Sequence, residues 1–88
     1  MRLKIKFFGW ARELAGRGDE ELEVNDGLTG EGLLDLLTNR HPGLKRIAPI
    51  LTLSVNMEYT PAQTTLKEGD EIALIPPVSG GRDLGKTF

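Results

Sequence analysis

Apolar and polar residues alternate along four stretches of this chain, and each stretch predicts a β-strand. In the first stretch Leu3, Ile5 and Phe7 lie on one face, while basic residues lie on the other. This alternation is typical of a strand with one face on the core and one toward water. The strands predicted in this way span residues 2–7, 20–24, 51–55 and 71–75.

A helical spacing of leucines follows Thr29, a residue that favours helix N-caps. The stripe that we interpret as core consists of Leu33, Leu34, Leu36 and Leu37. This main helix is predicted to reach about Arg40, because Pro42 prevents its continuation. A shorter helix is predicted over residues 11–15, with Gly16 as its stop.

The connections between these elements restrict how the strands pair. A turn over 16–19 makes the first two strands antiparallel neighbours, and residues 56–59 predict a tight turn into a short return strand. The last strand is placed to pair centrally with the first. This order of elements predicts an α+β fold of the β-grasp type, with a mixed sheet packed on one main helix, over residues 1–77.

The composition matters mainly for what it excludes. The 88 residues contain no cysteine, so disulfides, thiolate metal sites and cysteine nucleophiles are ruled out. With 11 basic and 13 acidic residues the net charge is -2, which argues against nucleic acid or an anionic membrane as the main partner. No apolar run approaches the ~20 residues that cross a bilayer, and the charged start is unlike a signal peptide. We therefore expect a cytoplasmic protein.

Three polar features suggest chemistry, and each has a simpler interpretation. Residues 80–87 fit the phosphate-loop pattern G-x-x-x-x-G-K-[ST], but only Phe88 follows them, which leaves no helix to bind a phosphate. His41, at the end of the main helix, is interpreted as a cap or surface residue rather than a metal ligand. The acidic run 19–21 with Glu23 is most simply a solvated edge strand, with the docking of a basic partner as the alternative.

Phe8 breaks the alternation of the first strand and lies on its outer side. If the first and last strands are neighbours, Phe8, Ala73 and Ile75 form an exposed apolar patch, and such patches usually mark an interface. Alternatively, Trp10, Tyr59 or a loop covers these side chains. The pattern leaves both possibilities open.

The segment after the last strand combines stiffness with missing side chains. Pro76-Pro77 stiffens the exit from the sheet, since neither residue donates to a ladder. Gly80-Gly81 is bare backbone, which threads a narrow channel in which any Cβ would clash. Residues 78–88 are predicted to form an extended, mobile tail. A flexible linker without a threading role is the alternative.

Four segments of the chain carry a family resemblance: 4–16, 33–37, 53–59 and 66–81. The last of them reads LKEGDEIALIPPVSGG and is the most specific. Together they resemble the MoaD/ThiS family of ubiquitin-like sulfur carriers, and its MoaD branch more closely. The resemblance covers nearly the whole of residues 1–81.

The resemblance implies a function at the end of the chain. An adenylyltransferase of the MoeB/ThiF type would use ATP to convert the Gly81 carboxylate to an acyl adenylate, and a sulfur donor would then leave a thiocarboxylate there. A MoaE-like large subunit would use this sulfur to build the dithiolene of molybdopterin. The apolar patch would fall near the docking face. The carrier itself is then not an enzyme and binds no cofactor. The residues that would thread the tail into these partners are Pro77, Val78, Ser79 and Gly80.

The chain departs from the family by continuing past Gly81 with residues 82–88. An amide at Gly81 cannot be adenylated as a carboxylate, so the resemblance requires a di-glycine protease that cuts between Gly81 and Arg82. Three alternatives stay open. They are a carrier for thiamine, tRNA or a tungsten cofactor, a ubiquitin-like modifier joined to lysines through Gly81, and a binding module with a permanently blocked tail.

Overall fold

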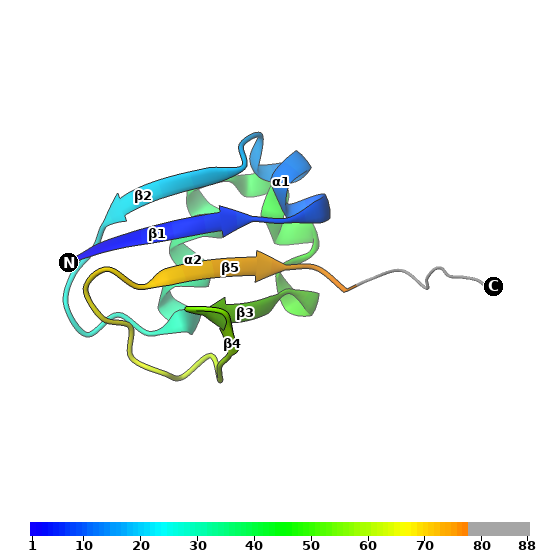
Figure 1. Cartoon of the computed structure of the whole chain (residues 1–88). Helices are drawn as coiled ribbons and strands as arrows, with labels where there is room; N and C mark the ends of the chain where they lie inside the picture. Colours follow the sequence, from blue (N-terminus) through cyan, green and yellow to red (C-terminus); the bar gives the residue numbers. More distant parts are fainter. Residues whose placement is uncertain (78–88) are drawn as a thin grey trace.

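A mixed sheet of five strands forms one layer of the protein (Figure 1). The computed structural model describes residues 1–77. Its strands are β1 (Arg2–Phe7), β2 (Asp19–Glu23), β3 (Thr52–Val55), β4 (Glu58–Tyr59) and β5 (Glu71–Ile75). Their order is β2-β1-β5-β3-β4, with β1 and β5 parallel in the middle and the other neighbouring pairs antiparallel. The predicted β-grasp arrangement is confirmed.

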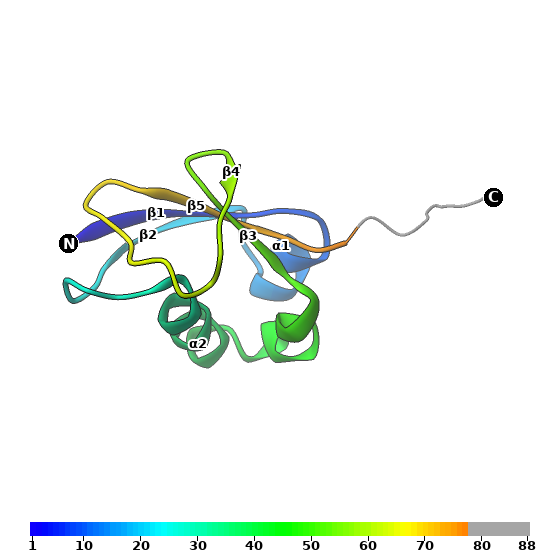
Figure 2. The ribbon, with the colours of Figure 1, turned by 90° about the horizontal axis from the view of Figure 1, so that it is seen from below.

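The second layer is helical. Its elements are α1 (Gly9–Ala15), α2 (Gly30–Arg40) and two short 3-10 helices, η1 (Pro42–Arg46) and η2 (Ala48–Ile50). Figure 2 shows α1 and α2 on the same side of the sheet, so the outer face of β1 and β5 carries none of the described helices. Each large core side chain contributes roughly 1.5–3 kcal/mol by its burial. The largest fully buried side chains are Leu3, Ile5, Leu33, Leu37, Leu44, Ile72 and Leu74.

Most element boundaries lie within one or two residues of the predicted ones. Thr29 caps α2 as expected, its Oγ1 accepting a hydrogen bond from Gly32 N at 3.1 Å. Helix α1 begins earlier than predicted, with Phe8 as its N-cap, and ends at Gly16 in the left-handed region. The residues between 42 and 50, where the pattern indicates no clear element, form η1 and η2.

Several predicted features lie outside the described residues. They are the tail over 78–88, the phosphate-loop pattern within it, and the cleavage position between Gly81 and Arg82. Within residues 1–77, no helix has the length and apolar character needed to cross a membrane.

Candidate functional site

The chain leaves the sheet at a fixed point beyond β5. Pro76 is buried, whereas Pro77 is exposed. Gly9 has a φ of +51°, and a Cβ built on it would lie only 3.1 Å from Pro76 Cγ. Next to this contact, Phe8 N donates to Leu74 O at 3.2 Å. The junction between β1 and α1 therefore holds the root of the tail against the domain.

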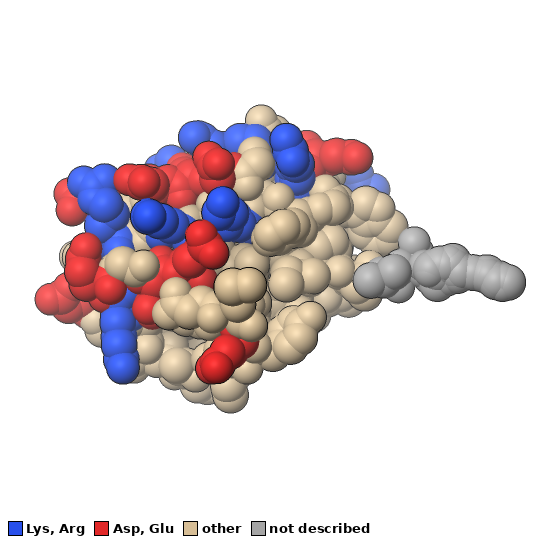
Figure 3. Space-filling model, in the orientation of Figure 1, with Lys and Arg blue, Asp and Glu red and all other residues tan. Residues whose placement is uncertain are grey.

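Phe8, Ala73 and Ile75 line one shallow groove on the outer face of the sheet. Met57 and Tyr59, from the turn between β3 and β4, also line it and are largely exposed. Figure 3 shows uncharged surface over this part of the face, while charged side chains gather toward its other end. Since Ile75 directly precedes the buried Pro76, the apolar groove adjoins the root of the tail.

The groove is open, so the first of the two possibilities left by the sequence is confirmed. Phe8 is half-exposed, and Tyr59 does not bury it. Trp10 lies elsewhere and lines a separate groove with Leu14 and Ile47. The described residues thus leave an apolar patch free on the outer sheet face, as an interface requires.

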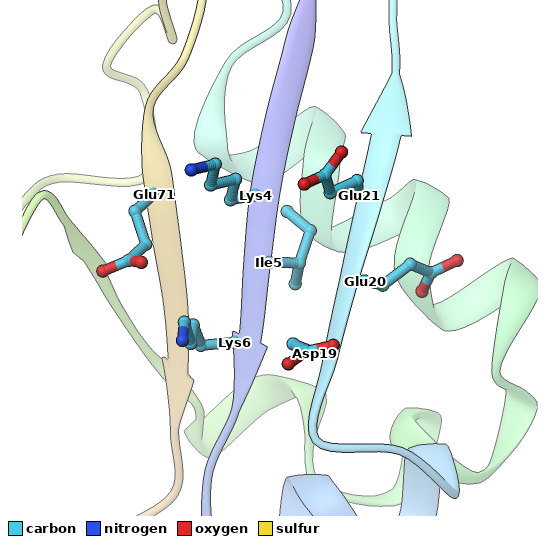
Figure 4. A pocket seen from close by; sticks show the side chains of 7 residues that line it. All are labelled: Lys4, Ile5, Lys6, Asp19, Glu20, Glu21 and Glu71. Atoms are coloured by element: carbon cyan, nitrogen blue, oxygen red, sulfur yellow. The ribbon is translucent and has the colours of Figure 1, made fainter.

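The other half of this face is a ladder of opposite charges (Figure 4). Lys4 of β1 lies between Glu21 of β2 and Glu71 of β5 in the strand register, and Lys6 lies opposite Asp19. Such cross-strand pairs stabilise a sheet by roughly 0.2–1 kcal/mol each. The outward acidic residues of β2 are thus matched by β1 lysines. This arrangement does not favour the alternative of docking a basic partner.

Glu20 contradicts the prediction that the acidic run is a solvated edge. Its side chain points away from the lysines in Figure 4 and is only 5% exposed. His41 Nε2 lies 2.8 Å from Glu20 Oε1, and Arg40 donates a hydrogen bond to Glu20 Oε2. The physical reason is the alternation itself, because Glu20 has the same parity along the strand as the buried Leu22.

Opposing influences act on the Glu20 carboxyl. Burial raises its pKa, whereas the hydrogen bonds and charges of His41 and Arg40 lower it, and together these hold the pKa of Glu20 below its ordinary value. The ring of His41 also meets Phe7 edge-on, with centroids 5.7 Å apart. His41 is the C-cap of α2, as predicted, but its side chain turns inward.

This polar cluster joins two elements rather than forming a reactive centre. It fastens β2 to the C-terminal end of α2 through Glu20. Residues 1–77 hold no group of three His, Cys, Asp or Glu side chains that could bind a metal ion. The surface with functional potential is therefore the apolar groove beside the root of the tail.

The family model for the ThiS family matches residues 5–81, which include both the groove and Gly81. The chain belongs to the ThiS family. This ThiS-family protein is 39% identical to a molybdopterin synthase sulfur carrier subunit of Chlamydomonas reinhardtii, over 92% of this chain and 100% of that protein. It is 37% identical to the protein of the same name from Arabidopsis thaliana, over 92% of this chain and 84% of the plant protein. These relatives identify it as a MoaD-like member of the family.

Solved structures agree with this assignment. SAMP1 from Haloferax volcanii superposes with a TM-score of 0.82 at 30% identity, over 92% of this chain and 100% of the archaeal one. A complex of subunits 1 and 2 of the molybdopterin-converting factor from Helicobacter pylori includes a chain with a TM-score of 0.68 at 30% identity. That match covers 92% of the ThiS-family chain described here and 100% of the bacterial chain.

The sequence predicted the groove residues but missed two supports of the site. The Gly9–Pro76 contact gives no periodic signal, because it joins a loop residue to the segment after the last strand. The Glu20 bridge had a signal, namely its parity with Leu22. The predicted threading residues Val78, Ser79 and Gly80 lie outside the described residues, as does Gly81.

Proposed function

We propose that this chain is the sulfur carrier subunit of a molybdopterin synthase, with the Gly81 carboxylate as its sulfur-bearing group. The observation that carries the proposal is the joint placement of an open apolar groove and the root of the tail. Ile75 lines the groove, Pro76 is fixed against Gly9, and Gly81 follows five residues later. The names of the relatives at 39% and 37% identity support the same function.

The chemistry takes place on the chain end and in partner proteins. A Gly81 carboxylate oxygen attacks the α-phosphate of ATP in an adenylyltransferase of the MoeB/ThiF type, and pyrophosphate leaves. Sulfur from a donor then attacks the acyl carbon, AMP leaves, and a thiocarboxylate remains. Gly80 and Gly81 carry no Cβ, so they suit a narrow channel. The chain acts as a carrier whose sulfur passes to a MoaE-like large subunit, and ATP belongs to the activating enzyme.

Residues 82–88 must be removed before this chemistry begins. While Arg82 is attached, the Gly81 carbonyl belongs to an amide and offers no carboxylate for adenylation. The family match ends at Gly81, so cleavage between Gly81 and Arg82 leaves a chain that spans the matched region. The core is not affected, because its residues lie between Leu3 and Leu74.

Intact-mass measurement tests this function. The form ending at Gly81 is incubated with the activating enzyme, ATP and a sulfide source from the same organism, in parallel with the full chain. We expect the truncated form to gain the mass difference between sulfur and oxygen, and the full chain to stay unchanged unless a protease is added. A truncated form that is never adenylated overturns the proposal.

A second function has one observation in its favour. SAMP1, whose name comes from small archaeal modifier protein, superposes with a TM-score of 0.82. A modifier would form an amide between Gly81 and a lysine of another protein. Lysine-linked adducts of residues 1–81 in cell extracts would favour this role. Sulfur delivery to thiamine, tRNA or a tungsten cofactor is distinguished by which acceptor enzyme takes up the thiocarboxylate.

A further inference from the structure

Three large apolar side chains stand half-exposed at the end of the domain where the chain leaves the sheet. Phe8 and Trp10 are each 48% exposed, and Ile50 is 50% exposed. Two of the three, Trp10 and Ile50, do not line the groove on the outer sheet face. Exposed apolar side chains gathered at one place mark an interaction surface more strongly than scattered ones.

The backbone places all three around the root of the tail. Phe8 and Trp10 flank Gly9, which lies against Pro76. Ile50 ends η2, two residues before Thr52, and Thr52 pairs with Ile75 at the end of β5. The three side chains therefore come from two separate chain segments that meet at the same end of the sheet. We call Phe8, Trp10 and Ile50 the collar.

Trp10 extends the apolar surface from the sheet side to the helical side. It lines a second groove with Glu13, Leu14, Arg46 and Ile47, formed between α1 and the 3-10 helices. Figure 2 shows α1 on the helical side of the sheet, away from the outer face that carries the first groove. The root of the tail thus lies between two grooves, one on each side of the sheet.

We infer that the collar is the surface that closes the mouth of the channel in which the large subunit takes the tail, with Trp10 as its anchor on the helical side. The inference rests on the proposed function, because only a partner that encloses the tail must press its rim against the root. A rim that meets Pro77 on all sides also meets Phe8, Trp10 and Ile50. Trp is the residue type most enriched among side chains that dominate binding energy.

The large subunit fits this surface better than a second copy of the chain. The collar is continuous with the outer groove through Phe8, so one partner covers both grooves and the root between them. In a second copy the matching end carries its own tail root, which would collide with the first. A chain similar to this one is found with subunit 2 in the Helicobacter pylori complex.

Trp10 is the only tryptophan, which permits a direct test. The form ending at Gly81, which retains every core residue, is labelled with fluorotryptophan and titrated with the large subunit from the same organism. We expect the fluorine resonance to shift and broaden on binding. Trp10→Ala is expected to weaken binding by at least about tenfold, while Trp10→Phe keeps most of the affinity. Unchanged melting temperatures show that both variants are folded.

The outcomes separate the inference from the proposed function. If the unsubstituted form does not bind the large subunit, the proposed function fails and the collar fails with it. If it binds, and Phe8→Ala weakens binding while the Trp10 resonance and the Trp10→Ala affinity do not change, the collar alone is wrong. The collar is also wrong if Trp10→Ala weakens binding only to the adenylyltransferase, or only self-association.

Discussion

Gly9 and Pro76 lie so close together that a Cβ on Gly9 would stand 3.1 Å from Pro76 Cγ. Gly9 also has a φ of +51°, a conformation that costs side-chain-bearing residues about 1–2 kcal/mol. One glycine therefore allows both the turn from β1 into α1 and the seating of the tail root. A carrier that presents its C-terminus to several partners benefits from such a fixed starting point.

Gly9→Val is expected to destabilise the fold by roughly 1–3 kcal/mol, because it combines a β-branched residue at positive φ with a collision against Pro76. Chemical denaturation measures this loss, and the yield of thiocarboxylate measures the effect on the tail. Gly27→Val is the matched control, since Gly27 has a φ of +91° and no neighbour within 4 Å of an added Cβ. If both variants form thiocarboxylate equally well, the contact with Pro76 does not position the tail.

Glu20→Gln is expected to cost about 1.5–3 kcal/mol of unfolding free energy, since it removes hydrogen bonds to a charged acceptor. Glu21→Gln, the neighbouring change on the outer face, is expected to cost less than about 1 kcal/mol, because its partner Arg2 is half-exposed. Urea denaturation of both variants compares the two. Equal losses would mean that the buried bridge adds nothing beyond a surface charge.

The Glu20 bridge also predicts how stability depends on pH. The pKa of Glu20 is lower in the folded protein than its ordinary value of 4.5, so the folded state favours the charged carboxylate. Its contribution is complete above the unfolded pKa and is lost as the pH falls through the folded pKa. The difference in unfolding free energy between the unsubstituted protein and Glu20→Gln is therefore expected to shrink below about pH 4.5. A difference that stays constant into acid contradicts this assignment.

The alternation of residues was sufficient to predict the sheet. Leu3, Ile5 and Phe7 point inward as predicted, and so do Ile72 and Leu74, because a strand with one buried face repeats every two residues. The same rule would also have placed Glu20 inside. A charged residue type outweighed the periodicity in that interpretation, since carboxylates are rarely buried unless they are paired. The partners, Arg40 and His41, are twenty and twenty-one residues away and leave no local signal.

Tertiary proximity explains what the pattern could not predict at the start of α2. Helix propensity alone makes Gly30 unfavourable. In the fold a Cβ on Gly30 would lie 2.9 Å from Leu53 Cδ1 and 3.2 Å from Ala62 O. The glycine lets the helix approach β3 and the loop after β4. This contact depends on segments more than twenty residues apart, so no local rule reveals it.

Met57→Gly is expected to stabilise the fold by roughly 0.5–1 kcal/mol, because Met57 has a φ of +72° in the turn between β3 and β4. Met57 is 89% exposed, so little buried surface is lost. Met57 also lines the outer groove, and the same variant is therefore expected to bind the large subunit less tightly. Met57→Ala keeps the strained φ and isolates the effect on binding. Thermal unfolding that shows no gain for Met57→Gly over Met57→Ala contradicts the strain argument.

Ala73→Glu places a charge in the middle of the outer groove without a severe effect on folding. In the strand register Ala73 lies opposite Lys6 of β1, whose ammonium group is available to the new carboxylate. A partner that covers the groove must then bury this charge, so we expect binding to the large subunit to weaken by more than about tenfold. Asn39→Asp is the control, because it adds the same charge to an exposed position of α2 on the opposite layer. Calorimetric titration of both truncated variants gives the two affinities. If Ala73→Glu binds as tightly as Asn39→Asp, the partner docks away from the groove.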